Sequence, residues 1–348
     1  MKERIVWVDY IKAFCIFFVV LLHANIGNPV ASFARVFVIP TFFFMSGLLF
    51  DIQKYLTYSV FFKKRILKIL TSYLFFNILT YLFWVVIGRH VGLDVENSEL
   101  ANPLRPLLGI LLGDYFQLLH YRPFWFLACL VSVEVLYYFL FKKNVRKFSF
   151  VILTGVFAIA YLDYHYKFIF LPWGFNIALS MILFFSLGVF SRPFLLSNFL
   201  KNNLFFLVLV VLISFSIVCF CSVYNSEVKV FIREYGNYIL FLIGALSGIV
   251  FMVSGSKLLA ENFSHNKFLR FIGRNTLIIL ALHLIVFSFV KAITFYIFKL
   301  PLSIYENQWA GVIMSVLSVM LLCPIIIFIN RYLPFLIGKD THDTSSKI

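Results

Sequence analysis

Long apolar segments separated by short polar ones run through the whole chain. A membrane helix needs about 20 mostly apolar residues, within a range of about 17–25. Backbone amides inside lipid must find hydrogen-bond partners within their own segment, which favours helices as the spanning structure. The pattern therefore predicts ten membrane helices, at residues 8–27, 34–50, 66–88, 124–141, 148–163, 174–190, 203–223, 237–255, 276–298 and 309–330.

The segments between these helices are short. The longest, 89–123, is too small to hold a catalytic domain of its own, so any chemistry belongs to the membrane region. Its part 104–119 is too short to span and is interrupted by Pro106, Gly109, Gly113 and Asp114, which indicates an interfacial or re-entrant piece. The sequence thus predicts an all-α polytopic membrane bundle with no soluble domain, a single membrane-embedded domain over residues 1–348.

Composition supports this class. Hydrophobic residues make up 62% of the chain and charged residues 13%, and the mean hydropathy is +0.96. An average soluble domain is about 45–50% apolar and about 25% charged. Too few polar side chains are present to cover a water-exposed surface, which argues against soluble folds and nucleic-acid modules. The five cysteines lie inside apolar runs without metal-ligand spacing, so we expect buried apolar thiols and no metal site.

The net charge of +15 reflects topology more than a nucleic-acid partner. Cytoplasmic loops of membrane proteins carry an excess of Lys and Arg. With the N-terminus in the cytoplasm, twenty Lys and Arg fall on the cytoplasmic side and eight on the other. We therefore expect a multi-pass protein of the cytoplasmic membrane with both termini in the cytoplasm. The loop 89–123, with Asp94, Glu96 and Glu99, then lies outside.

Six ionisable residues within the predicted spans are candidates for function. Each costs at least about 2.5–3.5 kcal/mol at the centre of the bilayer, so each is a functional candidate by default. They are Asp9, Lys12, His23, Glu134, His283 and Lys291. Lys291 is expected to snorkel outward.

The first predicted helix carries three of the six. Asp9 and Lys12 are three residues apart, so they share a face and can pair. Lys12 and His23 are eleven residues apart, which gives an angular offset of about 20° and a separation of about 16 Å along the axis. One interpretation is a polar path across the membrane with His23 as acid or base, because neutral imidazole accepts a proton near pH 7. The alternative is a structural Asp9–Lys12 pair with His23 reaching water at the outer end.

Several segments resemble the membrane acyltransferase-3 family, which includes polysaccharide O-acetyltransferases and proteins similar to fucose 4-O-acetylase. The first helix of that family carries an acidic residue, a basic residue, ten further residues and a histidine, matched here by Asp9, Lys12 and His23. Weaker similarities are scattered over the chain, in Val38–Phe50 (with Phe43, Phe44, Ser46 and Gly47), Phe61–Leu70 (with Arg65-x-x-Lys68 for the basic R-x-x-R motif), Arg122–Leu130 (with Trp125) and Leu277–Phe287 (with His283). Lysine replaces the usual arginine at 12 and 68, which keeps the charge but loses the bidentate fork.

The resemblance implies transfer of an acyl group, usually acetyl from acetyl-CoA, to a sugar hydroxyl across the membrane. His23 would act as general base or carry the acyl group as an acyl-imidazole, and the residues alone leave both roles open. Lys12 would stabilise the thioester oxyanion or the pantetheine arm, and Asp9 would hold Lys12 or interact with the surroundings of CoA. Arg65, Lys68 and Lys64 would form a cationic mouth for the CoA phosphates, although a basic cluster after a span is also a plain topology signal.

The resemblance places the acceptor, a cell-surface glycan or lipid-linked sugar, towards the outer side. Candidate contacts are Glu134, Trp125, Arg122 and His283. Glu134 could instead orient His23 or be a buried acid paired with a distant base. Trp125 with Arg122 could be an interfacial aromatic anchor, and His283 could be a packed, hydrogen-bonded histidine. Asp114 and His120 are weaker candidates. The competing function is a polysaccharide exporter of the same family, which the absence of internal symmetry disfavours. A sensor or scaffold would not need the charged stripe on the first helix.

Overall fold

The computed structural model describes residues 5–90, 102–142, 148–196, 204–263 and 266–339. Within these ranges the chain forms helices joined by turns, with one isolated antiparallel bridge between Lys229 and Glu234. Some of the charges used in the topology argument lie outside the described residues, namely Lys2, Arg4, Asp94, Glu96, Glu99, Lys143, Arg146, Lys147, Lys201 and Lys347.

The α-helices follow the predicted spans closely. They are α1 (Val6–Leu22), α2 (Asn28–Leu49), α3 (Tyr58–Phe61), α4 (Leu67–Val86), α5 (Leu104–Leu112), α6 (Trp125–Phe141), α7 (Ser149–Tyr166), α8 (Phe175–Leu195), α9 (Leu204–Tyr224), α10 (Tyr238–Asn262), α11 (Lys267–Arg274), α12 (Thr276–Ala292) and α13 (Gln308–Tyr332). Among the described residues, nine helical segments are long and apolar enough to cross a membrane. The remaining predicted span, the first along the chain, corresponds to α1, which is 17 residues long. The predicted polytopic helical fold is confirmed.

The chain divides into two compact units, each described here by itself. The first unit comprises Met1–Phe50, Met181–Leu280 and Phe287–Met320, and the second comprises Asp51–Ser180, Ala281–Val286 and Leu321–Ile348. A single functional domain over the whole chain stays a prediction.

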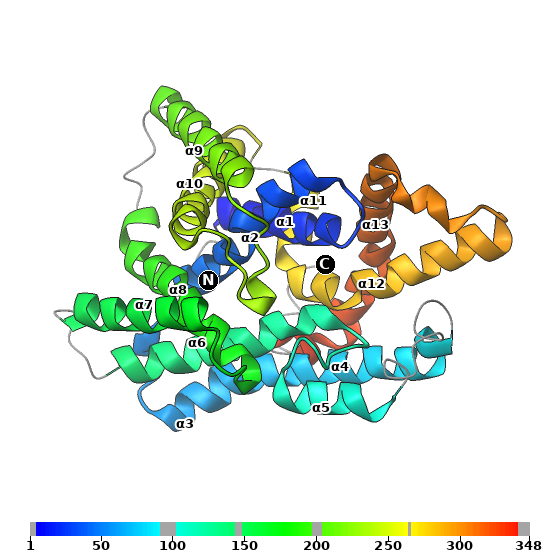
Figure 1. The fold of residues 1–348 in the computed structure, drawn as a ribbon, viewed down its shortest axis with the longest axis horizontal. Helices are drawn as coiled ribbons and strands as arrows, with labels where there is room; N and C mark the ends of the chain where they lie inside the picture. The colour runs from blue at the N-terminus through cyan, green and yellow to red at the C-terminus, as the bar shows by residue number, and fades with distance from the viewer. Residues whose placement is uncertain (1–4, 91–101, 143–147, 197–203, 264–265, 340–348) are drawn as a thin grey trace. The chain divides into compact units, whose positions relative to one another are not determined.

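In the first unit, close helix packing depends on glycines. The helices α9 and α10 lie side by side (Figure 1), and α10 also packs on α2 and α1. A Cβ at Gly248 of α10 would stand 2.1 Å from the Cβ of Phe37 in α2. A Cβ at Gly273 of α11 would stand 1.8 Å from the carbonyl oxygen of Asp9 in α1. Small residues let membrane helices approach this closely, so these two glycines set the spacing around α1 and α2.

In the second unit, α4 and α6 hold the intervening turns in place. Tyr73 of α4 donates to the Ile110 carbonyl of α5 at 2.8 Å, and Ser132 of α6 donates to the Trp173 carbonyl at 2.8 Å. Trp173 has a φ of 59°, a left-handed backbone that is unusual for a bulky side chain. The Ser132 hydrogen bond and the Tyr73 ring, 5.3 Å from the Trp173 ring centre, hold this turn. The two helices thereby fix the turn that leads into α8.

Candidate functional site

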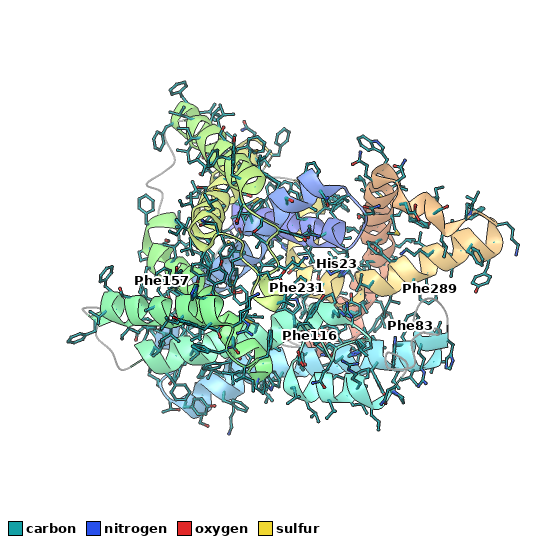
Figure 2. The ribbon with its side chains drawn as sticks, viewed as in Figure 1. His23, Phe83, Phe116, Phe157, Phe231 and Phe289 are labelled. Carbon is teal, nitrogen blue, oxygen red and sulfur yellow. The ribbon has the colours of Figure 1, made fainter. Side chains whose placement is uncertain are left out.

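His23 stands at the end of α1, where the backbone still has helical dihedral angles (Figure 2). Its Nδ1 lies 2.7 Å from the carbonyl oxygen of Val19, one turn earlier in the same helix. A carbonyl oxygen only accepts, so Nδ1 carries the hydrogen of this bond. When the ring is neutral, Nε2 then holds the lone pair. The end of α1 thus presents His23 with a defined tautomer and Nε2 as its basic atom.

The buried carboxylate of α1 is bound by a residue far along the chain. Asp9 is 2% exposed, and Arg274, the last residue of α11, donates from Nε to its Oδ2 at 3.0 Å. The Gly273 contact described above brings the start of α1 and the end of α11 together. The ion pair with Arg274 offsets part of the cost of burying the Asp9 side chain. The sequence therefore identified Asp9 correctly as an unusual buried acid but did not identify Arg274 as its partner.

Lys12 lies on the regular part of α1, three residues after Asp9, and is partly buried. Because α1 is an unbroken helix and His23 continues its geometry, Lys12 and His23 fall on the same side of the helix axis. This agrees with the stripe expected from the sequence. The first unit therefore contains the three first-helix residues of the predicted site.

The predicted cationic mouth of Lys64, Arg65 and Lys68 begins in a π-helical turn, which is wider than an α-helical one. Residues Phe62–Ile66 form a π-helical turn in which the Leu67 amide donates to the Phe62 carbonyl. Lys64 is exposed in this turn, and Lys68 follows, partly buried, in the first turn of α4. Ser72, one turn further, donates to the Leu336 carbonyl at 2.7 Å. The segment after α13 therefore packs against the same end of α4 that carries the basic residues. Single π turns inside helices occur frequently at functional sites.

Arg65 and Glu134 form a bidentate ion pair between the π turn and α6. Arg65 donates from Nε to Oε2 of Glu134 at 2.8 Å and from Nη2 to Oε1 at 2.5 Å. The Glu134 side chain is completely buried, whereas 34% of the Arg65 side chain is exposed. Parallel fork-to-carboxylate bonds fix both position and orientation. The sequence selected both residues for separate roles, on the donor and the acceptor side, and the structure brings them together.

A second polar cluster joins α4, α12 and the turn before α6. The Tyr121 hydroxyl lies 3.1 Å from Nδ1 of His283, and the Leu284 amide donates to the same hydroxyl at 3.4 Å. On the other side, Nε2 of His120 lies 3.1 Å from Oδ1 of Asn77 in α4. Two neighbouring residues of one turn thus contact two different helices. The sequence pattern identified His283 but not Asn77, which carries no charge, or Tyr121, which lies just before the fourth predicted span.

The remaining two predicted contacts differ in exposure. Trp125, the first residue of α6, is 7% exposed and buried within the unit. Arg122 is exposed, and its guanidinium carbon lies 5.4 Å from the ring centre of Tyr115, in cation–π contact. Of these two side chains, that of Arg122 is exposed to a ligand and that of Trp125 is buried.

The predicted site residues fall into both units. The first unit holds Asp9, Lys12 and His23, and the second holds Lys64, Arg65, Lys68, Arg122, Trp125, Glu134 and His283. Within the described ranges, no three His, Cys, Asp or Glu side chains gather as ligands for a metal ion.

Comparison with known proteins gives one positive result. Neither the curated proteins nor the solved structures contain a match to the chain. A protein-family model described as an acyltransferase domain matches residues 5–329, nearly the entire chain. The matched range includes every residue of the predicted site, from Asp9 to His283. The chain therefore belongs to the membrane acyltransferase-3 family.

Proposed function

We propose that the protein is an O-acyltransferase that moves an acetyl group from cytoplasmic acetyl-CoA to a hydroxyl of a cell-surface glycan or lipid-linked sugar. The observation that carries the proposal is the tautomer of His23. Nδ1 donates its hydrogen to the Val19 carbonyl, so Nε2 has the lone pair that can accept the proton of an alcohol. Family membership supports the acyl-transfer class of reaction.

In the proposed reaction, Nε2 of His23 accepts the proton of the sugar hydroxyl while the hydroxyl oxygen attacks the thioester carbonyl. The tetrahedral intermediate collapses with cleavage of the carbon–sulfur bond. The CoA thiolate leaves and takes the proton from the imidazolium, which restores the neutral ring. Lys12, on the same side of α1 but about 16 Å from His23 along the axis, contacts the pantetheine arm of the donor instead of the oxyanion, and Asp9 with Arg274 anchors that end of the helix.

The donor is proposed to bind through the basic residues at the start of α4. Lys64 and Lys68 supply positive charge for the CoA phosphates. Glu134 uses two of the five N–H donors of Arg65, so Arg65 contacts the donor through the remaining ones. In this proposal Glu134 is a positioning residue for Arg65.

The acceptor is proposed to bind through groups of the turn before α6. Arg122 offers hydrogen-bond donors to sugar oxygens, and Trp125 supports the turn from its buried side. The pair Tyr121–His283 adds a polar anchor between this turn and α12.

The decisive experiment compares two histidine variants in a strain that lacks the chromosomal gene. His23→Ala is expected to abolish acetyl esters on the surface polysaccharide, measured by NMR, without lowering the amount of protein in the membrane. His165→Ala, which removes an exposed histidine of α7, is the matched control and is expected to retain full modification. Unchanged acetylation in His23→Ala would remove His23 from the mechanism.

The choice between direct transfer and an acyl-imidazole has its own test. We favour direct transfer, so incubation of wild-type protein with radiolabelled acetyl-CoA and no acceptor is expected to leave the protein unlabelled. Label that stays on the wild-type protein after denaturation, and is absent from His23→Ala, would establish the covalent route instead.

A further inference from the structure

His120 is a buried histidine whose two ring nitrogens have different surroundings. The side chain is 9% exposed and lies in the turn between α5 and α6. Nε2 contacts Oδ1 of Asn77, and the ring stands edge-on to Tyr81 with 5.9 Å between ring centres. Nδ1 is also buried, and within the described residues it has no hydrogen-bond partner. A buried polar atom without a partner costs about 1–3 kcal/mol, which calls for an explanation.

The tautomer of His120 follows from Asn77. The amide nitrogen of Asn77 donates to the Tyr73 carbonyl at 2.8 Å, which turns Oδ1 towards His120. Since Oδ1 only accepts, Nε2 of His120 must carry the hydrogen. Burial lowers the pKa of His120 to about 4, so the ring is neutral at physiological pH. Nδ1 is therefore a lone-pair acceptor held in a fixed position.

The lone pair on Nδ1 of His120 binds a ligand group that donates a hydrogen. The phosphates and the thioester carbonyl of CoA offer only acceptor atoms to Nδ1, and two acceptors repel; the pantetheine hydroxyl and amide groups can donate, so the KM for acetyl-CoA is measured beside that for the acceptor. A sugar hydroxyl offers a hydrogen. The residue next to His120, Tyr121, belongs to the same turn and is bound to His283, so this turn is anchored on both α4 and α12.

We propose that Nδ1 of His120 accepts a hydrogen bond from a hydroxyl of the acyl acceptor and so forms a polyol-binding subsite that Asn77 positions. This inference rests on the proposed function. His120 binds and orients the acceptor, and the proton transfer remains with His23.

The test uses full-length protein in detergent, acetyl-CoA, and the surface polysaccharide of the host after mild alkaline removal of its esters. In His120→Gln, the amide nitrogen takes the position of Nε2 and keeps the contact with Asn77, while the acceptor at Nδ1 is lost. The KM for polysaccharide is expected to rise about three- to tenfold, the effect of one neutral hydrogen bond, with the KM for acetyl-CoA unchanged. His120→Asn places an amide oxygen near the position of Nδ1 and is expected to give a smaller rise.

Thr80→Val is the matched control. Thr80 is fully buried, lies three residues from Asn77 on α4, and its hydroxyl is already bonded to the Phe76 carbonyl at 2.8 Å. Both KM values are expected to stay at wild-type levels in this variant. An unchanged polysaccharide KM in His120→Gln, or a rise confined to acetyl-CoA, would overturn the subsite and leave the proposed function standing. Wild-type protein that transfers no acetyl group at all would overturn both.

If His120→Gln does not accumulate, nitrogen-15 NMR of wild-type protein with labelled histidine decides the question. Oligosaccharide fragments of the same polysaccharide are expected to shift an unprotonated Nδ1 resonance towards hydrogen-bonded values. His23 is distinguishable, because its Nδ1 is protonated. Nδ1 resonances that do not respond to the fragments would contradict the proposal.

Discussion

Glu134 is completely buried, and Arg65 binds both of its carboxylate oxygens. Removing one partner of a buried pair is costly because the other charge stays behind without compensation. Removing both is far less damaging. The pair is therefore a structural support as well as a proposed part of the donor site, and the two roles need separate tests.

Arg65→Gln is expected to lower the free energy of unfolding by about 3 kcal/mol, at the lower end for a broken buried pair, because Arg65 is one-third exposed. The double variant Arg65→Gln/Glu134→Gln is expected to recover more than half of this loss, since no charge is left behind. Thermal unfolding in detergent measures both. A double variant as unstable as the single one would show that Glu134 does not depend on Arg65.

At the scale of residues, the sequence identified individual groups better than their partners. Asp9, Glu134 and His283 are conspicuous because polar groups inside apolar runs are expensive. Their partners are not, because Arg274 and Tyr121 lie near span ends, where polar residues are common. The pairs Asp9–Arg274 and Arg65–Glu134 join residues 265 and 69 positions apart. Helical periodicity carries no information over such distances.

At the scale of elements, α10 shows how one helix is fitted to its neighbours. Gly244 and Gly248 are four residues apart, and a methyl group on either would meet a neighbouring helix: Val36 of α2 and Cys221 of α9 for the former, Phe37 for the latter. Further along the same helix, Gly255 has nothing within 4 Å of its would-be Cβ. The helix thus contains two glycines that face a neighbouring helix closely, Gly244 and Gly248, and one that faces open space, Gly255.

Gly248→Ala is expected to destabilise the protein by about 1–3 kcal/mol, because the methyl group has to displace Phe37. Gly255→Ala is the matched control and is expected to be neutral or slightly stabilising, since alanine favours helix. The fraction of protein that stays monodisperse after heating, measured by size-exclusion chromatography, compares them. Equal behaviour of the two variants would contradict the role assigned to Gly248.

Some helix boundaries could be predicted from the sequence and others could not. The ends of α6 and α9 fall within one residue of the predicted spans, because apolar runs end abruptly there. The start of α2 was placed six residues late, at 34, although Asn28 and Pro29 begin the helix. Proline fits the first turn, where its missing N–H is not needed. The end of α10 was placed at 255, whereas the helix continues for seven more residues to Asn262, where Ser256, Lys257, Glu261 and Asn262 interrupt the apolar run without ending the helix.

At the scale of the whole molecule, the number of spans determines the topology. The ten spans predicted from the sequence would put both termini on one side, and the Lys and Arg distribution favours the cytoplasm. Ser226, between α9 and α10, is then expected outside, and Gln53, between α2 and α3, is expected inside.

Single-cysteine labelling in intact cells tests this orientation. In a background without the native cysteines, Ser226→Cys is expected to react with a membrane-impermeant maleimide, because the position is exposed and outside. Gln53→Cys, also exposed, is expected to react only after the cells are permeabilised. The reverse pattern would invert the topology and with it the cytoplasmic entry of acetyl-CoA.

The bond between Asp9 and Arg274 has a consequence for biogenesis. The ribosome makes Arg274, the guanidinium partner, 265 residues after Asp9. The ion pair that joins α1 to α11 therefore cannot form while the helices in between are being synthesised. The docking of α1 against α11 has to wait until Arg274 emerges, and we expect nascent chains that stop before Arg274 to be recognised by membrane quality control.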